Sequence, residues 1–218
     1  MKKVSFRNSD MAWDISALIL TPPDFDEAKQ YPTVISVHPF GSCKEQTSSA
    51  TYGKALAEAG YVVIAFDASF QGESGGEPRF VEDPTQRVED VSRVIDYAVT
   101  LPYVDAEKIA GIGVCGGGGY VFNAALTEKR IKAVVGITPV NIGRLFREGF
   151  SMYNPIGALE GMAAQRTAEA RGGERLVNEL LPTSLAEARD NGMTERDVYE
   201  ATEYYKTPRG QQPGGATR

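Results

Sequence analysis

The sequence predicts a protein of the α/β class, in which a mostly parallel β-sheet is flanked by helices and followed by a helical lid. Short apolar runs alternate with longer amphipathic runs from Val4 to about Pro139, a pattern typical of strands and the helices that cover them. A cluster of glycines marks one junction between the two kinds of run. From Ile142 to Tyr205 there are helical signals but no strand-like run, which indicates a separate helical segment.

The composition indicates a globular protein that binds small molecules. The chain has 218 residues, of which 42% are hydrophobic and 24% are charged, enough for one sizeable core. Its net charge of -6 offers no basic patch for nucleic acid. No apolar run approaches the ~20 residues of a membrane helix, and the start does not resemble a leader, so we expect no membrane partner. With only two cysteines, Cys43 and Cys115, we expect a cytoplasmic protein without a disulfide framework.

Six apolar runs are predicted to form strands. The third run is rich in β-branched residues, and the fifth is apolar throughout. The predicted strands are Val4–Arg7, Ile15–Leu20, Thr33–His38, Tyr61–Asp67, Ile109–Val114 and Ile131–Ile137.

Three helices are predicted between these strands. The first covers Thr47–Ala59 and ends at Gly60, and the last covers Gly116–Thr127. The middle helix begins with Asp83 as its cap and Pro84 at its first position. Its buried face is predicted from apolar residues three and four positions apart, which are Val88, Val91, Ile95 and Ala98.

The chain is predicted to have three parts. Residues 1–140 form the α/β core, residues 141–206 a helical lid, and residues 207–218 a flexible tail that has no large apolar side chain to anchor it. Within the lid, Ser184–Glu187 and Thr194–Asp197 are predicted capping boxes. The pair Gly172-Gly173 is predicted to break the longest helix.

The chemistry is expected at Cys115, in the segment Gly113-Val-Cys-Gly-Gly117 between the fifth strand and the helix that follows. This is a nucleophile elbow, Gly-x-nucleophile-x-Gly, with cysteine in the place of serine. Gly113 and Gly117 are expected because neighbouring backbone passes too close for a β-carbon. The helix that begins at Gly116 has free amides and a positive dipole end, which favour a thiolate.

Two other interpretations of this segment remain open. Cysteine is often a buried packing residue, although a packing cysteine would not need the glycines that follow it. The same stretch also spells a dinucleotide fingerprint at Gly111, Gly113 and Gly116. A dinucleotide site needs an acidic residue near the end of the next strand, and the sequence there is 136–140, Gly-Ile-Thr-Pro-Val. We therefore favour the elbow.

Other polar residues are expected at the same edge of the sheet. His38 and Asp67 each follow a predicted strand and are candidate pocket residues. A structural role is favoured for both, because histidine can tie down a loop and aspartate caps turns. Glu82 and Asp83 are interpreted as a helix start rather than as an acid and base pair. With a single histidine and no residues at ligand spacing, no metal site is expected.

Three motifs in order resemble those of bacterial α/β-hydrolases related to dienelactone hydrolase, many of which have a cysteine nucleophile. They are the elbow at Gly113, the stretch His38-Pro-Phe-Gly-Ser-Cys-Lys-Glu-Gln-Thr47 and the stretch Gln71-Gly-Glu-Ser-Gly-Gly-Glu-Pro-Arg79. The resemblance implies an α/β-hydrolase fold over the core and a lid after the sixth strand. It also implies an oxyanion hole made by the backbone N–H groups of Phe40 and Gly116.

The resemblance further implies two strands beyond the lid, which would carry the acid and the histidine of a triad. The sequence stops at Arg218, and His38 is its only histidine, so no residue after Cys115 supplies an imidazole. We expect a split or truncated protein whose acid and histidine lie on a partner polypeptide. We also expect the edge of the sixth strand to be covered, by the missing segment or by another copy of the chain.

The predicted function is hydrolysis of a carboxylic ester, lactone or thioester through Cys115, with no cofactor. One alternative is a pseudo-enzyme or a binding and assembly subunit. Another is a thiolate that works with the oxyanion hole alone. A nucleotide-binding protein that uses the Gly111-Gly113-Gly116 turn ranks last.

Overall fold

The computed structural model describes residues 1–149, 153–177, 181–193 and 195–216. Its six strands form one sheet in the order β1-β2-β4-β3-β5-β6. β1 pairs antiparallel with β2, and β2 with β4, whereas the other neighbours are parallel. The strands are β1 (Lys2–Phe6), β2 (Ile15–Leu20), β3 (Tyr31–Val37), β4 (Val62–Phe66), β5 (Val104–Val114) and β6 (Ile131–Ile137).

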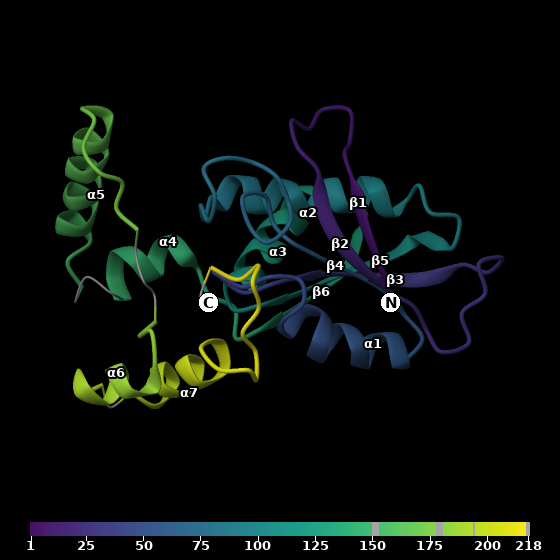
Figure 1. Ribbon diagram of the computed structural model, residues 1–218. Coiled ribbons are helices and arrows are strands. Elements are labelled where there is room, and N and C mark those ends of the chain that lie inside the picture. Colours follow the sequence, from purple (N-terminus) through teal and green to yellow (C-terminus); the bar gives the residue numbers. More distant parts are fainter. Residues whose placement is uncertain (150–152, 178–180, 194, 217–218) are drawn as a thin grey trace.

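Helices cover both faces of this sheet (Figure 1). On one face lie α2 (Pro84–Ala98) and α3 (Gly116–Thr127), which pack against the larger apolar cluster around Ile15, Ile35 and Ile64. On the other face, α1 (Lys54–Glu58) packs against a smaller cluster that includes alternate strand residues such as Leu18 and Val63. The two clusters use opposite faces because strand side chains alternate in direction. The predicted mostly parallel sheet flanked by helices is confirmed.

The start of α2 follows the prediction. The Asp83 side chain accepts hydrogen bonds from the backbone N–H groups of Thr85 and Gln86, and Pro84 occupies the first turn. Three of the four predicted face residues are fully buried and the fourth, Val88, is partly buried. The capped, amphipathic pattern was therefore sufficient to place this helix.

The single helix predicted over 47–59 is divided in the structure. Residues Thr47–Gly53 form a π-helix, η1, and only Lys54–Glu58 form the α-helix α1. Ser36 of β3 donates its hydroxyl hydrogen bond to the backbone oxygen of Ser48 at 3.0 Å. This hydrogen bond from the sheet uses a backbone carbonyl in the first turn of η1, and a π-helix has wider turns than an α-helix. The periodicity of the sequence cannot reveal such a contact.

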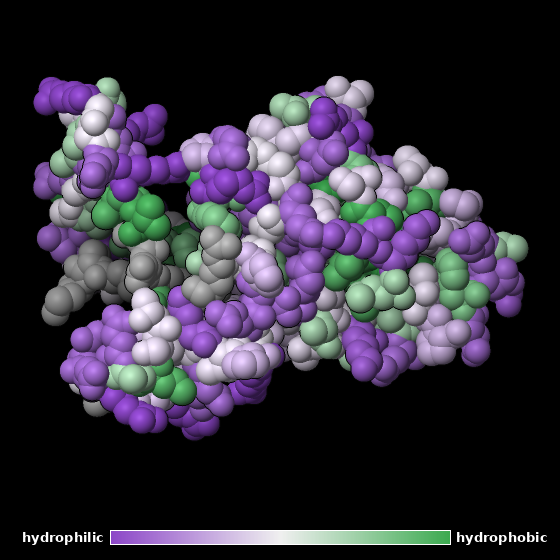
Figure 2. Space-filling model, viewed as in Figure 1, coloured by the Kyte–Doolittle hydropathy of each residue, from purple (hydrophilic) through white to green (hydrophobic). Residues whose placement is uncertain are grey.

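All the described elements after β6 are helices, and they gather beyond the carboxyl edge of the sheet (Figure 1). α5 stands away from the core, and apolar side chains are visible on its surface (Figure 2), with Ile156 65% exposed. α5 ends at Ala170, and Gly172 then adopts a positive φ of 88°. The elements in the predicted lid region are α4 (Ile142–Arg144), η2 (Leu145–Gly149), α5 (Pro155–Ala170), α6 (Leu185–Asp190) and α7 (Arg196–Tyr205).

The two predicted capping boxes have different outcomes. The Ser184 hydroxyl accepts the N–H of Glu187, as predicted, but the Glu187 carboxylate accepts the N–H of Thr183 rather than that of Ser184. The reach of the glutamate side chain decides this partner. The second box begins at Thr194, which lies outside the described residues.

The predicted flexible tail makes specific contacts with the core in the structure. The Gln46 side-chain amide donates to the backbone oxygen of Gly210 at 2.6 Å, and the Gly72 N–H donates to the backbone oxygen of Gly214 at 3.2 Å. Gly210 and Gly215 are buried. Hydrogen bonds to its backbone oxygens hold this segment at the carboxyl edge of the sheet (Figure 1).

The last strand in the sheet, β6, has one side without a partner strand among the described residues. Its residues are only partly buried or exposed, and Val135 is 52% exposed. Such an edge presents N–H and C=O groups that can pair with another strand. No helix within the described residues is long and apolar enough to span a bilayer.

Candidate functional site

Cys115 lies at the junction of β5 and α3, in a backbone conformation that side chains rarely adopt. Its φ is 53° and its ψ is -122°, which costs about 1–3 kcal/mol for a residue other than glycine. Its N–H donates to the backbone oxygen of Ile137 at 3.0 Å, and its own oxygen accepts from Gly118 and Val140, each at 3.0 Å. These bonds from β6 and α3 hold the strained residue in place. Cys115 is partly exposed.

The glycines around Cys115 allow three segments to pass close together. A β-carbon on Gly113 would lie 2.2 Å from the backbone oxygen of Gly117, and one on Gly117 would lie 2.3 Å from the backbone oxygen of Val37. Both distances are shorter than real carbon–oxygen contacts. The elbow therefore packs against β3, and this packing explains the glycines without a bound nucleotide.

The two predicted oxyanion donors lie next to each other. A β-carbon on Gly116 would be 3.3 Å from the backbone nitrogen of Phe40 and 3.1 Å from Cδ1 of Ile142. Gly116 is the first residue of α3, so its N–H points out of the helix start. Within the part of the chain that the structure describes, neither N–H is paired with a protein acceptor. Both donors are thus available beside Cys115.

His38 is fully buried, and both nitrogens of its ring have partners. Nδ1 lies 2.8 Å from the backbone oxygen of Pro39, which can only accept, so Nδ1 carries the proton. Nε2 accepts from the Ala68 N–H at 3.1 Å, and Nη1 of Arg87 lies 2.8 Å from Nε2 and 3.2 Å from Nδ1. Burial, with the charge of Arg87, lowers the pKa of His38 well below its usual value. The ring stays neutral and is not free to take a proton.

Asp67 is also fully buried and holds a lysine. Its carboxylate accepts from the backbone N–H of Lys44 at 2.8 Å, from the Lys44 ammonium at 2.6 Å and from the Glu73 N–H at 2.9 Å. The Lys44 ammonium also pairs with Glu45 at 2.7 Å and with Glu73 at 2.6 Å. Burial lowers the pKa of Lys44, but these carboxylates outweigh burial and raise it overall. Asp67 thus fixes the loops that follow β3 and β4.

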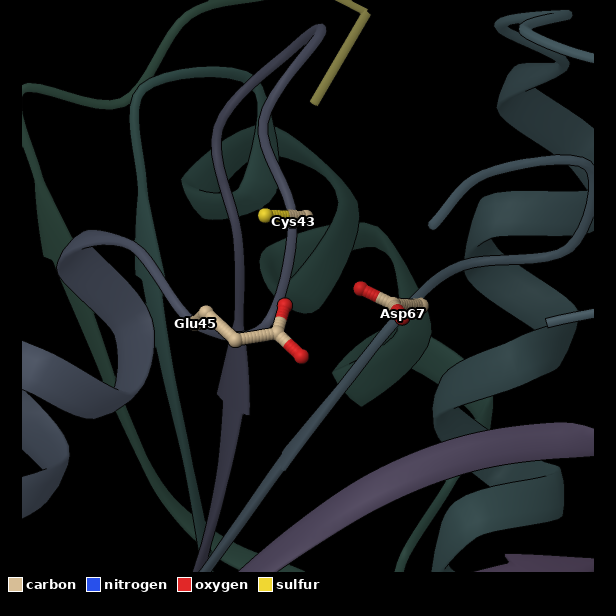
Figure 3. A group of neighbouring side chains, drawn as sticks. All are labelled: Cys43, Glu45 and Asp67. Carbon is tan, nitrogen blue, oxygen red and sulfur yellow. The ribbon is translucent and has the colours of Figure 1, made fainter. Parts of the chain in front are cut away.

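Cys43, Glu45 and Asp67 lie close enough to suggest a metal site (Figure 3), because one ligand atom of each falls within 4.8 Å of the others. The electrostatics favour a different interpretation. The Lys44 ammonium already neutralises both carboxylates, and burial, with Asp67 and Glu45, raises the pKa of Cys43 to about 12. A protonated thiol is a poor metal ligand. The donor set therefore fits a lysine cation better than a metal ion.

The lid adds residues that sequence patterns did not identify. Phe146 of η2 lies beside Phe40, with ring centroids 5.9 Å apart. Tyr205, the last residue of α7, is largely covered, and burial raises the pKa of its hydroxyl to about 12, with the nearby Cys115 adding to the shift. These contacts join residues distant in sequence, and no local pattern could have shown them.

Arg87 was also missed, although a signal for it exists. It lies on α2 four positions before Val91 and seven before Val94, which puts an arginine on the face predicted to be buried. Arg87 is 2% exposed. Its Nε lies 3.3 Å from Glu82, and the Glu82 carboxylate also accepts from the Gln71 amide at 2.6 Å. Glu82 is therefore an ion-pair partner in addition to its place before the helix.

A pocket of about 380 Å³ lies beside α3, between the start of α2 and the loop after β6. Gly119, Tyr120 and Ile142 line it, but Cys115 does not. Cys115, at the junction of β5 and α3, lies outside the lining of this pocket.

Comparisons with known proteins identify the family of the chain. A family model described as X-Pro dipeptidyl-peptidase (S15 family) matches residues 13–210. The chain is 46% identical to YcjY of Escherichia coli (strain K12) over 216 residues, which are 97% of this chain and 69% of that protein. The crystal structure of PA2218 from Pseudomonas aeruginosa matches with a TM-score of 0.85 at 33% identity, covering 99% of this chain and 66% of that chain. The chain thus spans about two thirds of the length of these relatives.

A more distant match concerns the fold alone. The alpha/beta hydrolase GrgF from Penicillium sp. sh18 matches with a TM-score of 0.65 at 21% identity, covering 94% of this chain and 73% of that chain.

Proposed function

The chain belongs to the X-Pro dipeptidyl-peptidase (S15) family and has an α/β-hydrolase fold, and we propose that it hydrolyses a carboxylic ester, lactone or thioester with Cys115 as the nucleophile. This function is that of the dienelactone-hydrolase-like enzymes that its motifs resemble. The observation that carries the proposal is the strained Cys115 beside two unpaired N–H groups, those of Phe40 and Gly116.

The proposed reaction begins with attack by the Cys115 thiolate. A bond forms from Sγ to the carbonyl carbon, and the C=O π electrons move onto the oxygen. The N–H groups of Phe40 and Gly116 stabilise that oxyanion. When the C=O bond re-forms, the alkoxide or thiolate leaves and an acyl-cysteine remains. Water then hydrolyses the acyl-cysteine, a step that needs a base.

The base is proposed to come from outside these 218 residues. His38 is the only histidine, and both of its ring nitrogens are occupied. The unpaired side of β6 offers a place for an additional strand that would carry the acid and the histidine. Such a strand would belong to a further segment, to a second polypeptide or to another copy of the chain.

The family is named for cleavage of a peptide bond, but the residues of this chain favour esters and thioesters as substrates. The reason is the leaving group. An amine must be protonated before it leaves, and no free imidazole in this chain can supply that proton. A thiolate or a stabilised alkoxide leaves without that help. The aromatic pair Phe40 and Phe146 would contact the group attached to the carbonyl, which favours an apolar acyl group.

The test is acetylation of the protein by p-nitrophenyl acetate, followed by intact mass and by nitrophenolate release. We expect one acetyl group per chain on the wild type, with slow turnover afterwards because the base is absent. Cys115→Ala should abolish acetylation, and the matched control Cys43→Ala should retain it. Acetylation that persists in Cys115→Ala, or that is absent from the wild type, would contradict the proposal.

The alternative is a binding or assembly subunit without catalysis. The observation that favours it is that both ring nitrogens of His38, the one histidine in these 218 residues, have hydrogen-bond partners. Co-purification with a second polypeptide that restores turnover would favour the split enzyme. A wild-type Cys115 that reacts no faster than a surface thiol would favour the binding subunit.

We also propose a reducing, cytoplasmic setting for this chemistry. The nucleophile must remain a free thiol, and both Cys43 and Cys115 are free.

A further inference from the structure

We propose that Arg87 is a positioning residue that orients the Phe40 N–H toward the reacting carbonyl by gripping His38. This inference rests on the function proposed above and names a residue that acts within the same site.

Arg87 contacts His38 at two different points. Its Nη2 donates to the backbone oxygen of His38 at 2.5 Å, and its Nη1 lies against the ring, 2.8 Å from Nε2 and 3.2 Å from Nδ1. The planar guanidinium holds its donors in a fixed relation. The backbone and the ring of His38 are therefore fixed relative to each other.

Fixing the His38 ring also fixes the peptide that contains the Phe40 N–H. Because Nε2 accepts from the Ala68 N–H, the proton lies on Nδ1, which donates to the backbone oxygen of Pro39 at 2.8 Å, while Arg87 holds the ring from Nη1. That oxygen and the Phe40 N–H belong to one planar peptide and point in opposite directions. Fixing the oxygen thus fixes the direction of the N–H.

The His38 backbone is also held from the side of the elbow. A β-carbon on Gly117 would lie 2.6 Å from the backbone oxygen of His38. The His38 carbonyl is therefore held between the first turn of α3 and the Arg87 guanidinium. This arrangement joins the two oxyanion donors, because Gly116 precedes Gly117 on that same turn.

Arg87 is itself buried between a carboxylate and an aromatic ring. Its Nε lies 3.3 Å from the Glu82 carboxylate, and its guanidinium carbon lies 4.9 Å from the centroid of the Tyr120 ring. A buried arginine with one ion pair and one aromatic face is both neutralised and immobilised. Arg87 is therefore suited to hold the loop after β3, so that the Phe40 N–H points into the oxyanion hole.

The test separates a reaction that needs the oxyanion hole from one that does not. Acetylation of Cys115 by p-nitrophenyl acetate passes through an oxyanion, whereas alkylation by iodoacetamide displaces iodide directly. For Arg87→Lys, we expect acetylation to fall about 10- to 100-fold, since loss of a whole oxyanion donor costs about 10²- to 10³-fold. We expect alkylation to change less than about twofold.

The matched control is Arg93→Lys, the same substitution on the same helix. Arg93, a partly buried residue, pairs with the exposed carboxylates of Asp10 and Glu89 and does not contact His38, so neither rate should change. In Arg87→Ala, added guanidinium ion should restore part of the acetylation rate, with sodium chloride at equal ionic strength as the blank. If the Arg87 variants do not fold, Glu82→Gln keeps Arg87 but loosens its ion pair, and it should lower acetylation in the same selective way.

Three outcomes would overturn the inference. Equal acetylation rates in wild type and Arg87→Lys, or in wild type and Glu82→Gln when that variant is needed, contradict it while leaving the proposed function intact. Equal losses of acetylation and alkylation indicate general damage rather than positioning. A wild type that is not acetylated at Cys115 contradicts both the inference and the proposed function.

Discussion

The Asp67 carboxylate holds Lys44 twice, through the backbone N–H at 2.8 Å and through the ammonium at 2.6 Å, and both side chains are fully buried. The pair connects the loop after β3 with the loop after β4, and both loops lie at the edge of the sheet where Cys115 is found. A buried charge that loses its partner is costly, because the low-dielectric interior cannot solvate it.

Lys44→Met is expected to destabilise the protein by about 3–5 kcal/mol, because it leaves Asp67 buried without its cation. The measurement is urea unfolding of wild type and variant. Lys3→Met is the control: Lys3 pairs with Glu73 at the surface, and its loss should cost about 0.5 kcal/mol or less. Similar costs for the two substitutions would mean that Asp67 finds other partners.

Glu73 is expected to contribute to stability in a pH-dependent manner. Hydrogen bonds from Lys3 and Lys44 lower its pKa from 4.5 to about 2. A lowered carboxyl pKa adds stability above the unfolded value, and this stability is lost as the pH falls through the folded value. Since the Glu73 side chain is 48% exposed, solvent screening limits the contribution to about 1 kcal/mol.

The measurement is the difference in unfolding free energy between wild type and Glu73→Gln. The difference should be constant above pH 4.5 and should shrink toward zero as the pH falls toward about 2. A difference that does not change with pH would show that the ion pairs of Glu73 are not its main contribution.

Gly113→Ala is expected to disrupt the elbow. Its β-carbon would stand 2.2 Å from the backbone oxygen of Gly117, and backbone must move to relieve the clash, at a cost of about 2–4 kcal/mol. Gly161→Ala is the matched control, because nothing lies within 4 Å of its β-carbon position on α5, and alanine there should be neutral or stabilising by up to about 1 kcal/mol. Thermal unfolding distinguishes the two, and an unaffected Gly113→Ala would rule out the close packing described here.

The two cysteines are expected to differ in reactivity. Cys115 is partly exposed, whereas Cys43 is fully buried and its pKa is raised to about 12, which leaves only about one thiolate in 10⁴ at pH 8. Iodoacetamide should therefore modify Cys115 alone in the folded protein, as measured by peptide mass mapping. Unfolding in urea should expose Cys43 to the reagent. Equal labelling of both thiols before unfolding would contradict the buried position of Cys43.

Most of the fold could be predicted because its signals are local. The helix capped by Asp83 was found from its cap, its proline and its apolar spacing, and all three lie within a few turns. The elbow was found in the same way, since the glycines at 113, 116 and 117 stand where backbone must approach closely. The helix over 47–59 was predicted less well, because a serine from β3 reaches into it.

The sequence by itself determined the α/β class, the position of Cys115 and the presence of a single histidine, His38, in these 218 residues. Only the tertiary structure decided what His38 and Asp67 do, which residues surround Cys115, and where the C-terminal segment goes. Arg87 lies 49 positions from His38, and Gly210 lies 164 positions from Gln46. The physical reason is that periodicity and capping depend on neighbours along the chain, whereas a buried ion pair or hydrogen bond depends on packing that brings distant segments together.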